Sequence, residues 1–137
     1  MTDERSAERD RRRERGEPVP ADLARGLAEA ARDKKAEGIV ILDLRGLTSM
    51  ADYFVVATVT TDVHARAVAE GVRMWAAETL EERPWHVEGD EGGRNWVLLD
   101  YVDVVVHLMQ PDVRIYYALE RLWGDAPREE VGDGEEG

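Results

Sequence analysis

Two apolar runs constrain the fold more strongly than any other feature of the sequence. Residues 39–44 and 53–58 are almost entirely apolar and are rich in β-branched and aromatic side chains. Strands of this composition present no polar face to water, so other elements must cover both of their faces. The two runs therefore predict an α/β fold in which helices pack on a central sheet.

Segments with helical spacing lie before, between and after the predicted strands. Leucine and alanine recur every three or four residues over 21–36, which predicts a helix there that ends before Gly38. Cap-type residues at 60–62 predict the start of a second helix over 62–81. A third helix is expected over 111–123, opened by a proline and closed by a glycine.

Three shorter strands complete the expected fold. Residues 85–87, 96–99 and 104–109 carry strand patterns, and the tight-turn composition of 100–103 predicts a hairpin between the last two. The three glycines and three acids of residues 88–93 predict a turn. The full order, α-β-β-α-β-β-β-α, predicts a mixed sheet of about five strands with helices packed on it.

The 137 residues suffice for one domain, and their charge is distributed unevenly. Residues 1–20 contain six arginines, six acids and only two large apolar residues, Met1 and Val19, which predicts a disordered charged tail. Residues 124–137 contain six acids, four glycines and one arginine, which predicts a disordered acidic tail. The folded domain is expected to span residues 21–123.

The overall composition excludes several classes of function. The formal net charge of −12 disfavours DNA, RNA and membrane surfaces as direct partners and favours a basic protein. The absence of cysteine excludes disulfides, thiolate catalysis and cysteine-based metal sites. No apolar run reaches the roughly 20 residues of a membrane helix. No signal peptide is visible, so the cytoplasm is the expected location.

Few residues offer catalytic or metal-binding chemistry. The three histidines, His64, His86 and His107, lie in different elements without metal-ligand spacing, and no glycine-rich phosphate loop is present. Asp100 and Asp103 form the best carboxylate pair, which could hold magnesium but which in a turn more commonly accepts backbone N–H groups. We therefore expect no metal, no cofactor and no catalytic residue.

The predicted hairpin over 96–109 is unusually apolar on both faces. By strand alternation Trp96, Leu98 and Asp100 share one face, while Tyr101 belongs to the other. Tryptophan and tyrosine combine a large apolar area with a polar group, and they commonly anchor interfaces. If the hairpin lies at the sheet edge, a partner strand could extend the sheet there.

Three motifs resemble the ribosomal silencing factor family, which is also called RsfS or Iojap. The motifs occupy residues 51–64, 96–107 and 114–127. Together they extend the resemblance over residues 23–127, with the elements in the same order. Three separate motifs in the expected order make the resemblance specific, whereas each motif alone would be weak.

The resemblance implies a translation repressor that is not an enzyme. Members of the family bind the large ribosomal subunit through its protein number fourteen, and they sterically block joining of the small subunit when nutrients are short. Their fold resembles that of nucleotidyltransferases, which use an Asp-x-Asp pair on a strand after a Gly-Ser turn. Here Leu47 follows Gly46, and Phe54 stands two residues after Asp52, so that catalytic pair is missing.

By motif position, the resemblance places the partner-binding surface on the hairpin and its turn. Trp96 would be the buried anchor, and His107 would hydrogen-bond at the rim. Asp100 and Asp103 would hold the turn and face basic groups of the ribosomal protein. The full set implied by the resemblance is Trp96, Leu98, Asp100, Tyr101, Asp103, His107 and Met109.

The turn of the hairpin departs from the family pattern at one position. Many relatives have glycine where this chain has Val102. A β-branched residue disfavours positive φ, so we expect this turn to keep a negative φ and to differ in shape.

Two other functions stay open at this point. The chain could be a nucleotidyl- or phosphoryl-transfer enzyme that uses Asp52, Asp100 and Asp103. Its strands and turns, however, do not gather the lysines, arginines or glycines that a nucleotide site requires. The chain could also be a structural α/β module that forms a homodimer.

Overall fold

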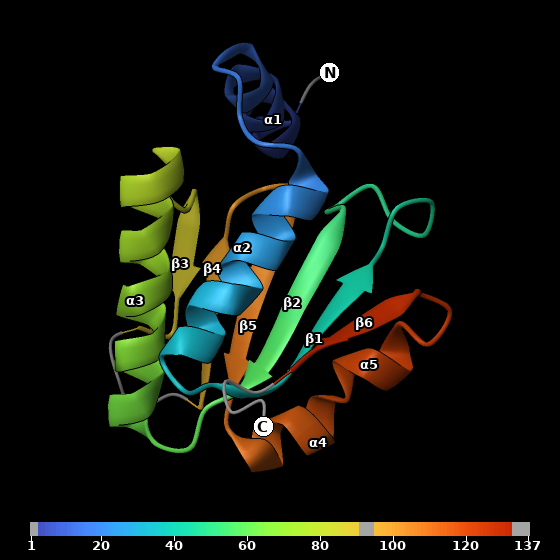
Figure 1. Cartoon of the computed structure of the whole chain (residues 1–137). Coiled ribbons are helices and arrows are strands. Elements are labelled where there is room, and N and C mark those ends of the chain that lie inside the picture. The colour runs from blue at the N-terminus through green and yellow to red at the C-terminus, as the bar shows by residue number, and fades with distance from the viewer. Residues whose placement is uncertain (1–2, 91–94, 133–137) are drawn as a thin grey trace.

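The computed structural model describes residues 3–90 and 95–132, and within them six strands form one mixed sheet. The strands follow the spatial order β3-β4-β5-β2-β1-β6. Figure 1 shows the arrangement of these elements. The strands are β1 Glu37–Asp43, β2 Tyr53–Thr58, β3 His86–Glu88, β4 Trp96–Asp100, β5 Val104–Met109 and β6 Arg128–Val131. The helices are α1 Glu4–Glu14, α2 Pro20–Asp33, α3 Asp62–Leu80, α4 Pro111–Tyr117 and α5 Leu119–Leu122.

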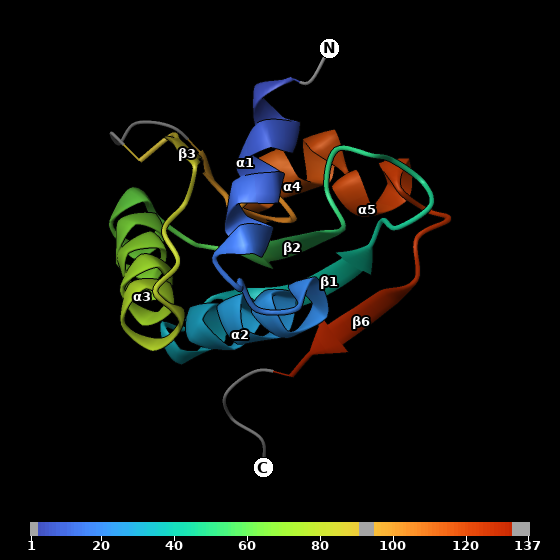
Figure 2. The same ribbon diagram turned by 90° about the horizontal axis from the view of Figure 1, so that it is seen from above.

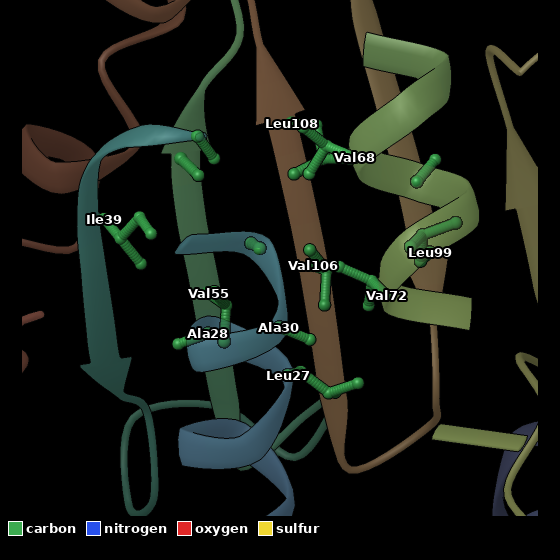
Figure 3. Close-up of a cluster of buried hydrophobic side chains, with 14 of the residues drawn as sticks. Leu27, Ala28, Ala30, Ile39, Val55, Val68, Val72, Leu99, Val106 and Leu108 are labelled. Carbon is green, nitrogen blue, oxygen red and sulfur yellow. The ribbon is translucent and has the colours of Figure 1, made fainter. Parts of the chain in front are cut away.

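Helices cover both faces of the sheet, as the two continuous apolar strands predict. Figure 2 shows α2 and α3 on one face and α4 and α5 on the other. The larger core lies under α2 and α3, where Leu27, Val68 and Val72 pack against strand residues such as Val55 and Val106 (Figure 3). The smaller core lies on the opposite face, under α4 and α5. The α/β class and the mixed sheet are therefore confirmed.

The pairing of the strands places the β4–β5 hairpin inside the sheet. β4 pairs with β3 on one side and with β5 on the other, and β5 also runs parallel to β2. The hairpin is therefore not at an edge, and a partner strand cannot extend the sheet beside it. The hairpin itself and the bounds of β2 agree with the sequence prediction.

Both segments expected to be disordered tails contain regular structure. Within residues 1–20, α1 forms behind an Asp3 cap whose side chain accepts the Ser6 N–H at 2.7 Å. Within residues 124–137, β6 adds an antiparallel strand beside β1. An exposed ion pair between Arg25 and Glu129 joins β6 to α2. Composition missed both elements because their partners come from distant parts of the chain.

The predicted helix over 111–123 is interrupted at Ala118, whose φ of +46° ends α4 and begins α5. Arg114 spans the break: it bonds the Glu120 carboxylate at 2.8 Å and the Thr58 hydroxyl at 2.9 Å. The change of direction buries Leu119 in the smaller core while leaving much of α4 exposed. Of the turn predicted over 88–93, residues 91–93 lie outside the described part of the chain.

Candidate partner-binding surface

The hairpin register brings most of the expected site onto one sheet face. Trp96 pairs with Met109, and Leu98 pairs with His107. These residues belong to the face covered by α4 and α5, where Trp96, Leu98 and Met109 pack with the smaller core. Tyr101 instead lies in the larger core on the opposite face. Strand alternation predicted this division correctly.

Burial separates the expected residues into accessible and supporting groups. Trp96 and Leu98 are half-buried, so a partner can reach them. The other five are buried: Asp100, Tyr101, Asp103, His107 and Met109. In this conformation Tyr101 and Met109 support the surface from within instead of touching a partner. Burial also raises the pKa of Tyr101 to about 12, so its hydroxyl stays protonated.

The indole of Trp96 is held in place by two side chains. Its Nε1–H donates to Nδ1 of His107 at 3.1 Å, and its ring lies 4.8 Å from the ring of Tyr117, centre to centre. Burial lowers the pKa of His107 to about 4, so the imidazole is neutral at physiological pH. Because Nδ1 accepts, its proton sits on Nε2. His107 is thus a buried support for Trp96, not the rim residue that the sequence predicted.

Next to Trp96, helix α4 carries an exposed aromatic surface that the sequence did not reveal. Ile115 and Tyr116 are 78% and 79% exposed. Leu122 of α5 is also exposed. A cavity of about 470 Å³ opens beside this surface. We call this cavity the aromatic groove. It is lined by Glu88, Gly89, Asn95, Trp96, Leu98, Val113 and Tyr117.

One feature of the sequence indicates that such a surface exists. Residues 113–123 contain more large apolar side chains than one face of a short helix can bury. The break at Ala118 decides which of them point inward, and that break depends on tertiary contacts of Arg114. The sequence therefore shows that some of these apolar side chains must be exposed, but it does not show which ones.

At the turn end of the hairpin, three carboxylates form a second feature, which we call the acidic corner: Asp100, Asp103 and Glu82. Each is buried and each is paired with an arginine of α1. The Arg5 guanidinium makes two bonds to Asp100, at 2.7 and 3.0 Å. Arg9 and Arg12 reach Asp103 and Glu82 at 2.7 and 2.8 Å, and those contacts complete the corner.

Two further carboxyl groups lie close to the acidic corner. Burial, with Asp103 and Glu82 nearby, raises the pKa of Glu17 to about 7. Burial also raises the pKa of Asp52, and Asp103 adds to that effect. Arg12 opposes the rise that burial causes in the pKa of Glu82. The corner therefore concentrates negative charge, which the arginines of α1 offset together with Arg15 and Arg45.

Val102 in the turn has a φ of +73°, so the expectation of a negative φ is wrong. The Asp100 carboxylate accepts the Val102 N–H at 2.8 Å, and Arg5 donates to the Val102 carbonyl at 2.6 Å. These bonds and full burial of the side chain hold a conformation that costs a β-branched residue about 1–3 kcal/mol. The turn thus keeps the left-handed backbone that glycine adopts easily.

The geometry gives the enzyme alternative no support. The carboxylates of Asp100 and Asp103 are engaged by arginines, and Asp52 meets Asp103 through a backbone bond of 2.8 Å from its N–H. Over residues 3–90 and 95–132, no group of three or more acidic or histidine side chains is placed to hold a metal ion. His64 lies in the first turn of α3, where its Nδ1 accepts the Thr60 N–H, and His86 lies on the edge strand β3.

Comparison with known proteins gives the family. The model of the family described as "Ribosomal silencing factor during starvation", RsfS, matches residues 17–136. The chain belongs to the RsfS family. The RsfS protein of Bacillus subtilis is 41% identical over 108 residues, which are 78% of this chain and 89% of that protein. The RsfS protein of Halalkalibacterium halodurans is 40% identical over 110 residues, 80% of this chain and 92% of that protein.

The family extends to a chloroplast protein and to solved structures. Chloroplastic Iojap of Zea mays is 32% identical over 104 residues, which cover 76% of this chain and 44% of that protein. A crystal structure from Chromobacterium violaceum superposes with a TM-score of 0.74 at 34% identity, covering 86% of this chain and 98% of that one. RsfS is a regulatory family and not a family of enzymes. Helix α1 precedes the matched residues.

No helix in the described part of the chain is long and apolar enough to cross a membrane.

Proposed function

We propose that the protein acts in the cytoplasm as a translation repressor that binds the large ribosomal subunit through its protein number fourteen. Bound there, it sterically blocks joining of the small subunit when nutrients are short. The proposal rests on membership of the RsfS family and on one structural observation. That observation is the half-buried Trp96, which lines the aromatic groove and contacts the ring of Tyr117 on α4.

The aromatic groove has the properties of a protein-binding surface. A monomeric protein rarely exposes several large apolar side chains side by side, and such patches commonly mark partner sites. Tryptophan and tyrosine supply much of the binding energy in protein interfaces. Both types meet here, because Tyr117 contacts Trp96 and Tyr116 contacts Tyr117, with ring centres 4.8 and 5.0 Å apart.

The charge of the chain fits a basic protein partner better than RNA. A formal net charge of −12 repels phosphates and attracts lysine- and arginine-rich proteins. Blocking then needs no chemical step: a rigid domain docked on the joining face excludes the other subunit by its volume.

Sedimentation with purified large subunits tests the proposal directly, followed by a subunit-joining assay without added nucleotide. The informative variant is Ile115→Ala with Tyr116→Ala, because both side chains are exposed and their removal leaves the core intact. We expect it to lose binding and to stop inhibiting joining. Met74→Ala is the matched control, since Met74 is exposed on α3, on the opposite face of the sheet.

Two results would contradict the proposal. In the first, the wild-type protein fails to stay on washed subunits. In the second, the double variant binds as well as the Met74 control. Light scattering of the same samples tests the homodimer alternative, which predicts that the double variant halves the mass without changing subunit binding.

A further inference from the structure

Helix α1 is attached to the domain through charged side chains. Its sequence contains one apolar residue, Ala7, and its only buried residue is Arg12. Arg5, Arg9 and Arg12 follow a spacing of four and three residues, so they form one stripe along the helix. All three point into the acidic corner, while Arg11 and Arg13 are exposed.

The contacts of the stripe are specific in geometry. Arg5 forms a fork on Asp100 and also donates to the Val102 carbonyl. Arg12 bonds Glu82 and, at 2.8 Å, the carbonyl of Arg83. Planar guanidinium groups recognise carboxylates in this bidentate way, which lysine cannot reproduce. The corner is therefore shaped to bind arginines presented along a helix.

The attachment of α1 is nevertheless suited to opening. The ion pairs of Arg9 with Asp103 and of Arg12 with Glu82 are largely buried, so the cost of removing both charges from water offsets much of their attraction. When α1 leaves, water solvates the carboxylates and the arginines, so no charge is left buried without a partner. Glu17, which links α1 to α2, adds a cost to the closed form. Its two carboxylate oxygens are buried and have no hydrogen-bond partner among the described residues.

The acidic corner adjoins the aromatic groove through β4. Asp100 ends the same strand in which Trp96 and Leu98 line the groove. A basic partner seated on Trp96 would therefore have its positive charges close to Asp100. In this structure the three carboxylates of the acidic corner already form ion pairs with α1.

We propose that α1 is an internal competitor of the basic partner. Its arginines occupy the acidic corner, where the resemblance to the family already implies that Asp100 and Asp103 face basic groups of that partner. Docking of α1 and docking of the partner then exclude each other. The inference rests on the proposed function for the identity of the partner. The occupied corner makes α1 a competitor that sets how tightly the protein binds.

The first experiment probes the corner without any ribosome. A fluorescent peptide with the sequence of residues 3–16 is added to the full chain, and its anisotropy is measured. The variant Arg5→Gln with Arg9→Gln releases α1, and the control Arg11→Gln with Arg13→Gln removes the same charge from its exposed face. We expect the first variant to bind the peptide at least ~5-fold more tightly than the control or the wild type, because a vacated site removes the competition. Equal binding by all three proteins, or no binding by any, overturns the inference.

The second experiment repeats the comparison with purified large subunits at low salt. The released variant should bind them at least ~5-fold more tightly than the wild type, and the control should not change. If the released variant binds subunits no better than the control, the partner does not use the corner and the inference is wrong. If no protein binds subunits while the peptide result holds, the proposed function fails, and the corner remains a site for arginine-bearing segments.

Discussion

Helices α1 and α2 follow each other in the chain but are attached by opposite means. Helix α2 buries six apolar residues, among them Leu23 and Leu27, against the larger core. Helix α1 buries one residue, an arginine, and contacts the domain through ion pairs. Salt does not screen apolar burial, which is cooperative with the core, whereas it weakens ion pairs that can exchange for water.

This difference suggests a division of labour between the two helices. Helix α2 cannot leave without exposing the centre of the molecule, so it belongs to the scaffold. Helix α1 contributes no residue to either core, so we expect it to separate while the sheet stays folded, which suits it to regulation. Variants that test each attachment in turn should therefore show global unfolding for α2 and local opening for α1.

The largest effect is expected from Leu27→Ala in α2. Leu27 is fully buried at the centre of the larger core (Figure 3), and its truncation leaves a cavity. Such a change lowers the free energy of unfolding by about 2–5 kcal/mol. Urea denaturation measures it, with Val63→Ala as the control because Val63 is exposed on α3. If only α2 unfolds and the rest of the domain stays folded, the assignment of α2 to the scaffold is wrong.

Trp96→Ala should affect binding more than folding, since the indole is only half-buried. We expect subunit affinity to fall by about 2 kcal/mol or more, as for other interface anchors. Trp96→Phe keeps an aromatic ring but loses the donor to His107, so it should retain part of the affinity. If Trp96 instead belongs to the scaffold as Leu27 does, melting will show a loss of roughly 3–5 kcal/mol.

The elements that the sequence predicted are those built like α2. The spacing of their apolar residues indicates both the type of element and the face that it buries. The predictions for residues 53–58 and 62–81 therefore agree with β2 and α3 to within one residue. Helix α1 has no such pattern. The role of its arginine stripe is evident only from the fold, which brings Asp100 and Asp103 beside it from 95 and 94 residues away in the chain.

The candidate site divides in the same way. Strand alternation alone predicts that Trp96 and Leu98 lie on one face. The positive φ of Val102 and the break at Ala118 could not be predicted, because hydrogen bonds from Arg5 and Arg114 stabilise them. The buried position of His107 also depends on α4, which covers its strand.

Arg12→Met should open α1 without unfolding the domain. The change removes the bonds to Glu82 and to the Arg83 carbonyl, and α1 can separate so that Glu82 meets water. We therefore expect the free energy of α1 docking to fall by about 1–2 kcal/mol, below the cost of stranding a buried charge. Hydrogen exchange should speed up in α1 amides only. Arg13 is exposed on the same helix, so the control variant Arg13→Met should leave the hydrogen exchange of the α1 amides unchanged. Faster exchange across the core would show that α1 belongs to the scaffold.

The smallest effect is expected from pH, through Glu17. Its pKa is raised from 4.5 to about 7 by burial and by Asp103 and Glu82, with Arg12 opposing them. The closed form thus holds a proton on Glu17 that the open form loses, so the contribution of Glu17 to α1 docking is fully present below pH 4.5 and is lost as pH rises through 7. Solvent screening limits the change in the free energy of α1 docking to on the order of 1 kcal/mol.

Hydrogen exchange of the α1 amides, corrected for the intrinsic rate, should show more opening at pH 8 than at pH 6. Glu17→Gln cannot ionise and should lose most of that difference. A variant that keeps the full pH dependence would assign it to Glu82 or Asp52 instead, whose pKa values burial also raises.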